Sequence, residues 1–165
     1  MTDKSETKPC VLDPETIEWQ SRQPYPAPYD NALAGRARRA LGDVLGLTQF
    51  GVNLGRLEPG AVSSLRHWHT GEDEFVLVLE GTPTLVTDDG EQLLGPGLAA
   101  GFPAHTENGH RLENRSDGPV LYLEVGTRAV RDVVTYPDAD LELIKEESGK
   151  KRTFRHKDGT RYTTK

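Results

Sequence analysis

The chain has few of the features needed to form a disulfide or to cross a membrane. Its 165 residues include one cysteine, Cys10, so no internal disulfide can form. No apolar run approaches the roughly 20 residues that span a bilayer. The polar start, MTDKSETKPC, lacks the charged-then-apolar layout of a secretory signal. These absences predict a cytoplasmic protein that has no membrane partner.

Positive charge is also in short supply. The chain has 20 basic and 26 acidic side chains, a formal net charge of −6, and no basic stripe. Binding to the phosphate backbone depends on such a stripe, so we expect no nucleic-acid partner. The basic clusters at residues 36–39 and 150–152 are interpreted as solvated surface.

Long helical patterns are missing from the central part of the chain. Residues 46–135 form short runs rich in Val, Leu, Phe and Tyr, closed by Gly, Pro or Asp about every eight to twelve residues. This spacing predicts an all-β barrel or sandwich of antiparallel strands. Residues 1–45 are predicted to be an arm that packs on the barrel or on a partner subunit, with helical composition over 31–41. Residues 136–165 are predicted to be a short, partly flexible C-terminal extension.

One predicted strand, Glu74 to Leu79, is apolar on both faces. A strand with one face in water alternates between polar and apolar residues instead. The outer face of this strand should therefore be covered by a second sheet, by the arm or by another subunit. We accordingly expect a homodimer.

Histidines concentrate where a metal site could form. His67 and His69 are two residues apart on a predicted strand, so both side chains point to the same face. Glu74 begins the next strand after a polar turn, and His110 begins another strand much later in the chain. Imidazoles and a carboxylate placed in this way can bind one ion at about 2.0–2.2 Å.

The complete spacing resembles the two motifs of the cupin superfamily. In the first, Gly60 is followed by His67-x-His69, Glu74 and Gly81, and in the second Gly97 and Pro103 are followed by His110 and Asn114. The resemblance covers about residues 46 to 126. It implies a double-stranded β-helix, or jelly roll, whose metal ligands are His67, His69, Glu74 and His110. The sequence of residues 46–81 and 108–128 is similar to the sequences of small bacterial single-domain cupins, some of which are labelled sugar-phosphate isomerases.

Two departures from the family pattern leave alternatives open. One extra residue separates Gly60 from His67, and a longer loop with an additional His105 precedes His110. His105 is either a group near the substrate or a loop residue at the barrel mouth. Asp73 is an alternative to Glu74, but it would point to the opposite face of the strand.

The predicted ligand set suits one divalent ion, Fe, Mn, Ni or Zn, and ligand type does not decide between them. The first hypothesis is a metalloenzyme of the isomerase, dioxygenase, lyase or decarboxylase type that acts on a small oxygen-rich metabolite. The second is a non-catalytic module that binds or senses a small ligand. The candidate substrate-binding residues are Gln49, Arg56, His105, Tyr122 and Glu124, although packing in the core or at an interface is the simpler interpretation of Tyr122.

Overall fold

The structure is a computed structural model that describes residues 8–146 and 152–163. Within these ranges the chain forms twelve strands and only two short helices, a 3-10 turn at Pro14–Thr16 and α1 at Leu41–Val44. The prediction of an all-β fold is confirmed. In the same ranges, no helix is long and apolar enough to cross a membrane.

The largest sheet has five strands in the order β1-β2-β9-β4-β7, and every neighbouring pair is antiparallel. Its strands are β1 (Arg36–Arg39), β2 (Phe50–Leu57), β9 (Val120–Thr127), β4 (Glu74–Glu80) and β7 (Ala99–Phe102).

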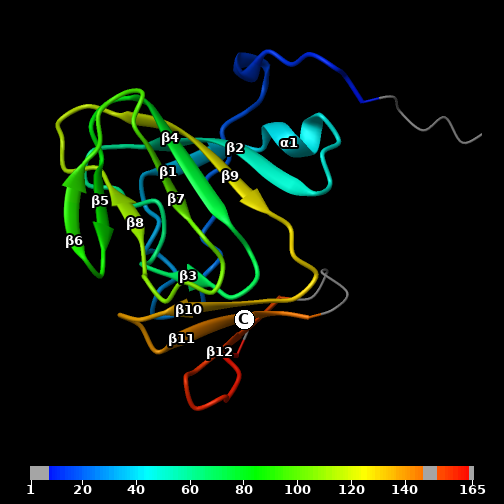
Figure 1. Cartoon of the computed structure of the whole chain (residues 1–165), viewed down its shortest axis with the longest axis vertical. Coiled ribbons are helices and arrows are strands. Elements are labelled where there is room, and N and C mark those ends of the chain that lie inside the picture. The colour runs from blue at the N-terminus through cyan, green and yellow to red at the C-terminus, as the bar shows by residue number, and fades with distance from the viewer. Residues whose placement is uncertain (1–7, 147–151, 164–165) are drawn as a thin grey trace, which may run out of the picture.

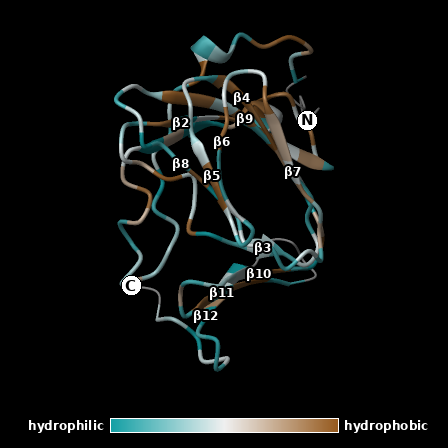
Figure 2. Cartoon of the chain, turned by 60° about the vertical axis from the view of Figure 1, so that its left-hand side comes forward, coloured by the Kyte–Doolittle hydropathy of each residue, from teal (hydrophilic) through white to brown (hydrophobic). Residues whose placement is uncertain are grey.

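Two smaller sheets complete the barrel. The three-stranded sheet has the order β6-β5-β8, and the four-stranded sheet has the order β12-β11-β10-β3. Their strands are β5 (Thr84–Thr87), β6 (Gly90–Leu93), β8 (Arg111–Glu113), β3 (Trp68–His69), β10 (Asp132–Tyr136), β11 (Leu141–Lys145) and β12 (Arg152–Arg155). The three-stranded sheet lies opposite the five-stranded sheet, and the four-stranded sheet lies at one end of the barrel (Figures 1 and 2).

The main core fills the space between the five-stranded and three-stranded sheets. Val78 on β4 and Tyr122 on β9 are fully buried there, and Leu85 and Leu112 pack from the opposite sheet. Burial of such side chains is the main favourable term in folding. The strands β4 and β9 accordingly carry much of the hydrophobic colour in Figure 2.

The two terminal regions build a second core beneath the barrel. Tyr25 and Leu33 from the N-terminal region pack against Val134, Tyr136 and Leu141 from the C-terminal region. The expected helical composition of residues 31–41 is wrong, because residues 36–39 instead pair with β2 as strand β1. In the charged C-terminal extension, residues 152–155 likewise pair with a neighbour, as strand β12 against β11. In both places pairing with a neighbouring strand overrides local composition.

Glycine at position 55 allows β2 to approach β9 closely. A Cβ atom added to Gly55 would lie 2.4 Å from Cζ of the buried Tyr122 ring. We therefore expect Gly55→Ala to lower the free energy of unfolding by about 1–3 kcal/mol, because Tyr122 must leave its packed position. Urea unfolding measures the change. Gly95→Ala is the matched control, since an added Cβ there meets nothing within 4 Å; equal stability of the two variants would contradict this account.

The outer face of β4 bears on the expected homodimer, which stays a prediction. Phe75 is 41% exposed and Leu79 is 40% exposed, so the arm and the other described segments leave this apolar face open. If a second copy covers the face, sedimentation should give the mass of two chains. Phe75→Glu should then yield monomers, and the exchange Glu91→Gln on the exposed strand β6 serves as a control. A monomeric wild-type protein would contradict the prediction.

Candidate metal centre

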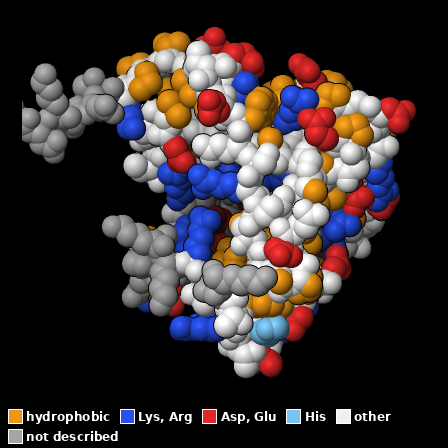
Figure 3. All heavy atoms as spheres, turned by 180° about the vertical axis from the view of Figure 1, so that it is seen from behind, with side chains coloured by type: hydrophobic (Ala, Val, Ile, Leu, Met, Phe, Trp, Pro, Cys, Tyr) orange, Lys and Arg blue, Asp and Glu red, His pale blue; other side chains and the backbone are white. Residues whose placement is uncertain are grey.

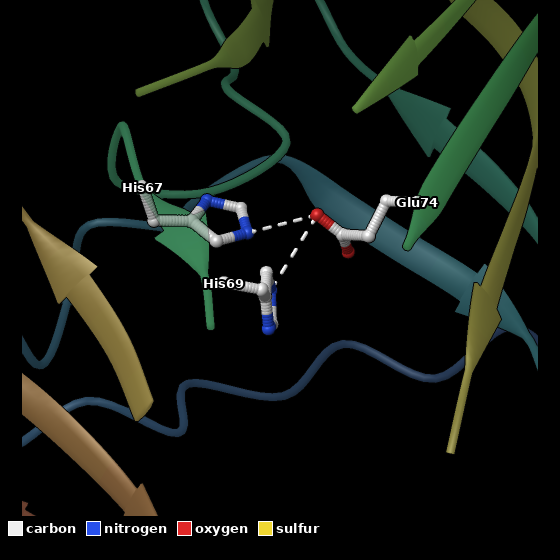
Figure 4. A group of neighbouring side chains, drawn as sticks. All are labelled: His67, His69 and Glu74. Atoms are coloured by element: carbon white, nitrogen blue, oxygen red, sulfur yellow. Dashed lines mark ion pairs between the residues drawn. The ribbon is translucent and has the colours of Figure 1, made fainter. Parts of the chain in front are cut away.

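Three imidazoles converge on one carboxylate oxygen. The Oε2 atom of Glu74 lies 3.3 Å from Nε2 of His67, 3.5 Å from Nε2 of His69 and 2.9 Å from Nε2 of His110. Figure 4 shows His69 on β3, and His67 directly before this strand, pointing toward Glu74 on β4. Glu74 and His110, which are 36 positions apart in the sequence, thus meet with His67 and His69 at a single point.

Strand pairing fixes the backbone of the four residues. His67 and His110 face each other across an isolated antiparallel bridge, with N–H···O distances of 3.2 and 2.9 Å. His69 in β3 pairs with Val134 in β10, and Glu74 begins β4. His67 and His69 point to the same side of the chain, as their two-residue spacing predicts.

Hydrogen bonds at Nδ1 orient two of the rings. The Nδ1 atom of His67 lies 3.0 Å from the carbonyl oxygen of Leu65, and Nδ1 of His69 lies 2.6 Å from Oδ2 of Asp132. A carbonyl or ionised carboxylate oxygen can only accept a hydrogen bond, so these Nδ1 atoms donate. In the neutral form of each ring the lone pair is then on Nε2, where a metal ion would bind, and in the protonated form the same Nε2 donates to Glu74. Such outer partners are the usual means of orienting a metal-binding histidine.

His110 is held by packing. Its ring stacks on Phe102 with centroids 3.5 Å apart, and its Nδ1 atom is buried without a hydrogen-bond partner among the described residues. Burial lowers the pKa of His110, outweighing the opposing effect of Glu74. A lowered pKa favours the neutral ring, which is the form that binds metals.

The electrostatics of the cluster favour an ionised carboxylate. Burial by itself would raise the pKa of Glu74, but the charge of His67 and hydrogen bonds from His110 and His67 hold it well below its usual range. Burial would likewise lower the pKa of His69. The hydrogen bond to Asp132 and the charge of Glu74 outweigh that effect, so the pKa of His69 is raised.

The alternative carboxylate, Asp73, lies outside this cluster. Asp73 is exposed, and its Oδ1 atom accepts a hydrogen bond of 2.8 Å from the backbone N–H of Ala104. Asp73 therefore holds the loop that follows β7, while Glu74 faces the imidazoles.

A second cluster of three residues, two of them acidic, adjoins the centre. Ligand atoms of His69, Glu72 and Asp132 also lie within 4.8 Å of one another. Glu72, however, is bound by Lys145 at 2.5 Å and by the backbone N–H of Ala129 at 3.1 Å. Asp132 accepts a hydrogen bond of 2.8 Å from the backbone N–H of Gly71. These partners identify the group as a support for His69.

The donor set fits one divalent ion. The ligand atoms of His67, His69 and Glu74 lie within 4.8 Å of one another, and Nε2 of His110 adjoins the same carboxylate oxygen. Three neutral nitrogens and one carboxylate suit Fe, Mn, Ni or Zn. Each of the three Nε2 atoms points toward Glu74, so a small rearrangement would allow an ion to replace their contacts with Oε2.

A cavity of about 310 Å³ opens beside these residues, and the sequence identified only part of its lining. Two of the candidate substrate-binding residues, Tyr122 and Glu124, line it from β9. Tyr122 also belongs to the main core, and burial followed by the charge of Glu124 raises its pKa to about 12. Glu124 accepts a hydrogen bond of 3.1 Å from the side-chain amide of Asn53.

The other three candidate substrate-binding residues do not line this cavity, and the position of each one explains why. Arg56 is on the outer face of β2, where it pairs with Glu58 at 2.8 Å. Gln49 is exposed just before β2. His105 is exposed in a turn with a φ of 63°, and its backbone N–H donates to the carbonyl oxygen of His69 at 2.9 Å. His105 therefore contributes a backbone hydrogen bond next to the site.

Sequence reasoning missed much of the cavity wall. The missed residues come from the two terminal regions, and they include Arg22, Tyr25, Arg36, Arg38, Tyr136 and Arg152. Alternation of Arg36 and Arg38 along the chain was an available signal, since residues two apart on a strand share a face. That signal requires residues 36–39 to be identified as a strand, which their composition does not indicate.

Comparisons with known proteins identify the family. A cupin-domain family profile matches residues 53–126. A crystal structure described as a sugar phosphate isomerase of the cupin superfamily from Silicibacter pomeroyi is 47% identical, covers 93% of this chain and 96% of its own, and superimposes with a TM-score of 0.87. The chain therefore belongs to the cupin superfamily, and its fold is the double-stranded β-helix that the sequence predicted.

Two other structures are similar at lower identity. One from Acidithiobacillus ferrooxidans, provisionally named a sugar phosphate isomerase, is 31% identical over 79% of this chain and 81% of its own, with a TM-score of 0.69. The polyketide cyclase RemF from Streptomyces resistomycificus is 21% identical over 71% of this chain and 78% of its own. Its TM-score is 0.58, and it shares the fold. No curated protein sequence matches this chain significantly.

The bond between Asp132 and His69 gives a test of the centre. Asp132→Asn keeps the shape of the side chain but removes the charge that orients His69, so divalent-metal affinity should fall about 10- to 100-fold. Titration with Zn and a competing chelator measures this affinity. His105→Asn is the control, because this exposed histidine lies outside the cavity and Asn tolerates a positive φ. Unchanged affinity in Asp132→Asn would contradict an orienting role.

Proposed function

We propose that this cupin binds one divalent metal through His67, His69, Glu74 and His110. We further propose that it is a metalloenzyme whose substrate is a small oxygen-rich metabolite. The single observation that carries the proposal is the convergence of three Nε2 atoms on Oε2 of Glu74 at the wall of a cavity. A bound divalent ion supplies Lewis-acid polarisation of a substrate oxygen.

The cavity suits a ligand of small size. Its volume of about 310 Å³ is at the lower end of the range typical for small-molecule sites. Apolar side chains such as Val76 and Phe102 form part of its lining, and polar groups converge on the remainder. Such a site can orient a substrate and limit its contact with water.

The wall also contains tyrosine hydroxyls that remain protonated. Burial and the nearby Tyr25 raise the pKa of Tyr136 well above its usual range. The ring of Tyr136 lies 5.8 Å from that of His67, centroid to centroid. The hydroxyl of Tyr136 is hydrogen-bonded to that of Tyr25 and stays protonated close to the imidazoles.

Within the enzyme classes considered, the comparisons favour an isomerase. Two structures that cover most of this chain, at 47% and 31% identity, carry the name sugar phosphate isomerase. An aldose–ketose isomerase that transfers a proton through an enediol lets solvent deuterium enter the substrate, whereas a hydride shift does not, so product formation is followed together with exchange. This exchange is the reaction to test first.

The experiment combines metal analysis with deuterium exchange. Protein purified without added metal should contain about one divalent ion per chain, and His67→Ala and His110→Ala should lose most of it. Samples reloaded with Fe, Mn, Ni or Zn are then incubated in D₂O with a panel of aldose phosphates and followed by NMR. We expect exchange with at least one ion, and none after chelation or in His67→Ala.

The outcomes separate the two parts of the proposal. Full metal content in both histidine variants would contradict the ligand assignment. A metal-loaded protein that binds a sugar phosphate without exchange or turnover would contradict the isomerase assignment and favour a non-catalytic binding module. His105→Asn should match the wild-type protein in both measurements.

A further inference from the structure

Four arginine side chains reach the cavity from the two terminal regions. Arg36 and Arg38 alternate on β1, opposite Leu57 and Gly55 of β2 in the register of the sheet. Leu57 belongs to the main core and Gly55 faces the ring of Tyr122, so this face of β1 is the inward one. Arg22 and Arg152 line the same cavity from the arm and from β12.

These positive charges exceed the carboxylates available to neutralise them. The described lining includes five arginines but only two carboxylates, Glu74 and Glu124. Arg111 has its own partner, Glu113, at 2.5 Å. Glu74 belongs to the candidate metal centre. Among the lining residues that the structure describes, Glu124 is then the carboxylate that remains for Arg22, Arg36, Arg38 and Arg152, and its Oε2 atom is 3.7 Å from the guanidinium of Arg36.

Arg39 on the opposite face of β1 provides an internal comparison. Two nitrogens of Arg39 bind the carboxylate of Glu15 at 2.6 and 3.2 Å, and its guanidinium lies 4.2 Å from the centre of the Trp19 ring. Among the described residues, no carboxylate lies within 4 Å of the Arg38 guanidinium. The outward arginine thus has a bidentate partner, whereas its inward neighbour has none.

Burial makes this lack of partners significant. The side chain of Arg36 is 13% exposed. Among the described residues, the Nε atoms of Arg36, Arg38 and Arg39 are all buried without hydrogen-bond partners, so it is the carboxylate partner of Arg39 that distinguishes it from Arg38. Buried donors and charges destabilise a protein unless they are paired. Burial, followed by the charge of Arg36, lowers the pKa of Arg38 and outweighs the opposing charges of Glu124 and Asp43.

The cavity joins a wider opening at this point. Arg38, Glu124 and Arg152 line both spaces, together with His69 and Glu74. On the face seen in Figure 3, Lys and Arg side chains gather at the edge of a hollow. A ligand that enters by this route meets the arginines and the candidate metal centre in one continuous space.

We propose that Arg22, Arg36, Arg38 and Arg152 form an oxyanion site that binds a phosphate or carboxylate group of the substrate. Guanidinium groups match these anions because their fork of N–H donors makes paired, charge-assisted hydrogen bonds. The substrate is then a small molecule with an anionic group at one end and metal-binding oxygens at the other. The second half of that description rests on the proposed function; the anion site itself does not.

The test uses inorganic phosphate and acetate on the full chain. Metal is removed with a chelator, so that neither anion can bind through the ion, and chloride and total ionic strength are kept constant. Calorimetry should show about one phosphate or acetate site per chain, and the tighter of the two identifies the group. NMR signals of arginine Nε–H groups should shift on binding.

Variants assign the site to particular arginines. Arg38→Gln and Arg22→Gln should each weaken binding of the preferred anion by about tenfold or more, because each removes a charged donor. Arg22 is exposed, so its loss should leave the fold intact. Arg38→Lys keeps the charge but loses the fork, and should bind more weakly than the wild-type protein and more tightly than Arg38→Gln.

The matched control is Arg56→Gln, which removes the same charge from the outer face of β2 and leaves the cavity unchanged. It should bind the anion like the wild-type protein. Equal losses in Arg56→Gln and Arg22→Gln, or no binding of either anion to the wild-type protein, would overturn the proposal. Phosphate binding by a chain that retains no metal and turns nothing over would support the anion site while contradicting the proposed function.

Discussion

The contact between Glu74 and three imidazoles is the interaction on which the rest of the site depends. A carboxylate in a partly buried position needs positive or hydrogen-bonding partners, and here the three Nε2 atoms provide them at 2.9–3.5 Å. To place those partners, the fold brings the beginning of β4 against β3 and against the His67–His110 bridge. The barrel thus joins the two sequence motifs at one point of the cavity wall.

The surrounding residues orient the three imidazoles, and further residues hold those partners in place. Asp132 and the carbonyl oxygen of Leu65 turn two rings toward Glu74, and Phe102 supports the third by stacking. Lys145 in turn holds Glu72 beside Asp132. Strand β10, which carries Asp132, and strand β11, which carries Lys145, both lie in the region that follows residue 126. This region therefore contributes to the centre although it lies beyond the matched cupin domain, residues 53–126.

Much of this arrangement was predictable from the sequence. Two-residue spacing placed His67 and His69 on one face, and turn residues placed Glu74 at the beginning of the next strand. His110 was found only through the second motif, because nothing local links it to His67.

The cavity wall was not predictable in the same way, since it depends on strand register between distant segments. Arg36 and Arg38 face inward only because β1 pairs with β2 as it does, and Arg56 faces outward for the same reason. Composition suggested solvated surface at residues 36–39. A polar sequence does not reveal which of its charges a neighbouring strand will enclose.

Anomalous X-ray scattering from crystals of the purified protein tests the central claim most directly. Data collected on both sides of the absorption edge of the ion found by elemental analysis would locate it without reference to the protein. The account predicts one anomalous peak bound by Nε2 of His67, His69 and His110 and by the carboxylate of Glu74. A peak among His69, Glu72 and Asp132 instead, or no peak in protein supplied with Fe, Mn, Ni and Zn, would contradict it.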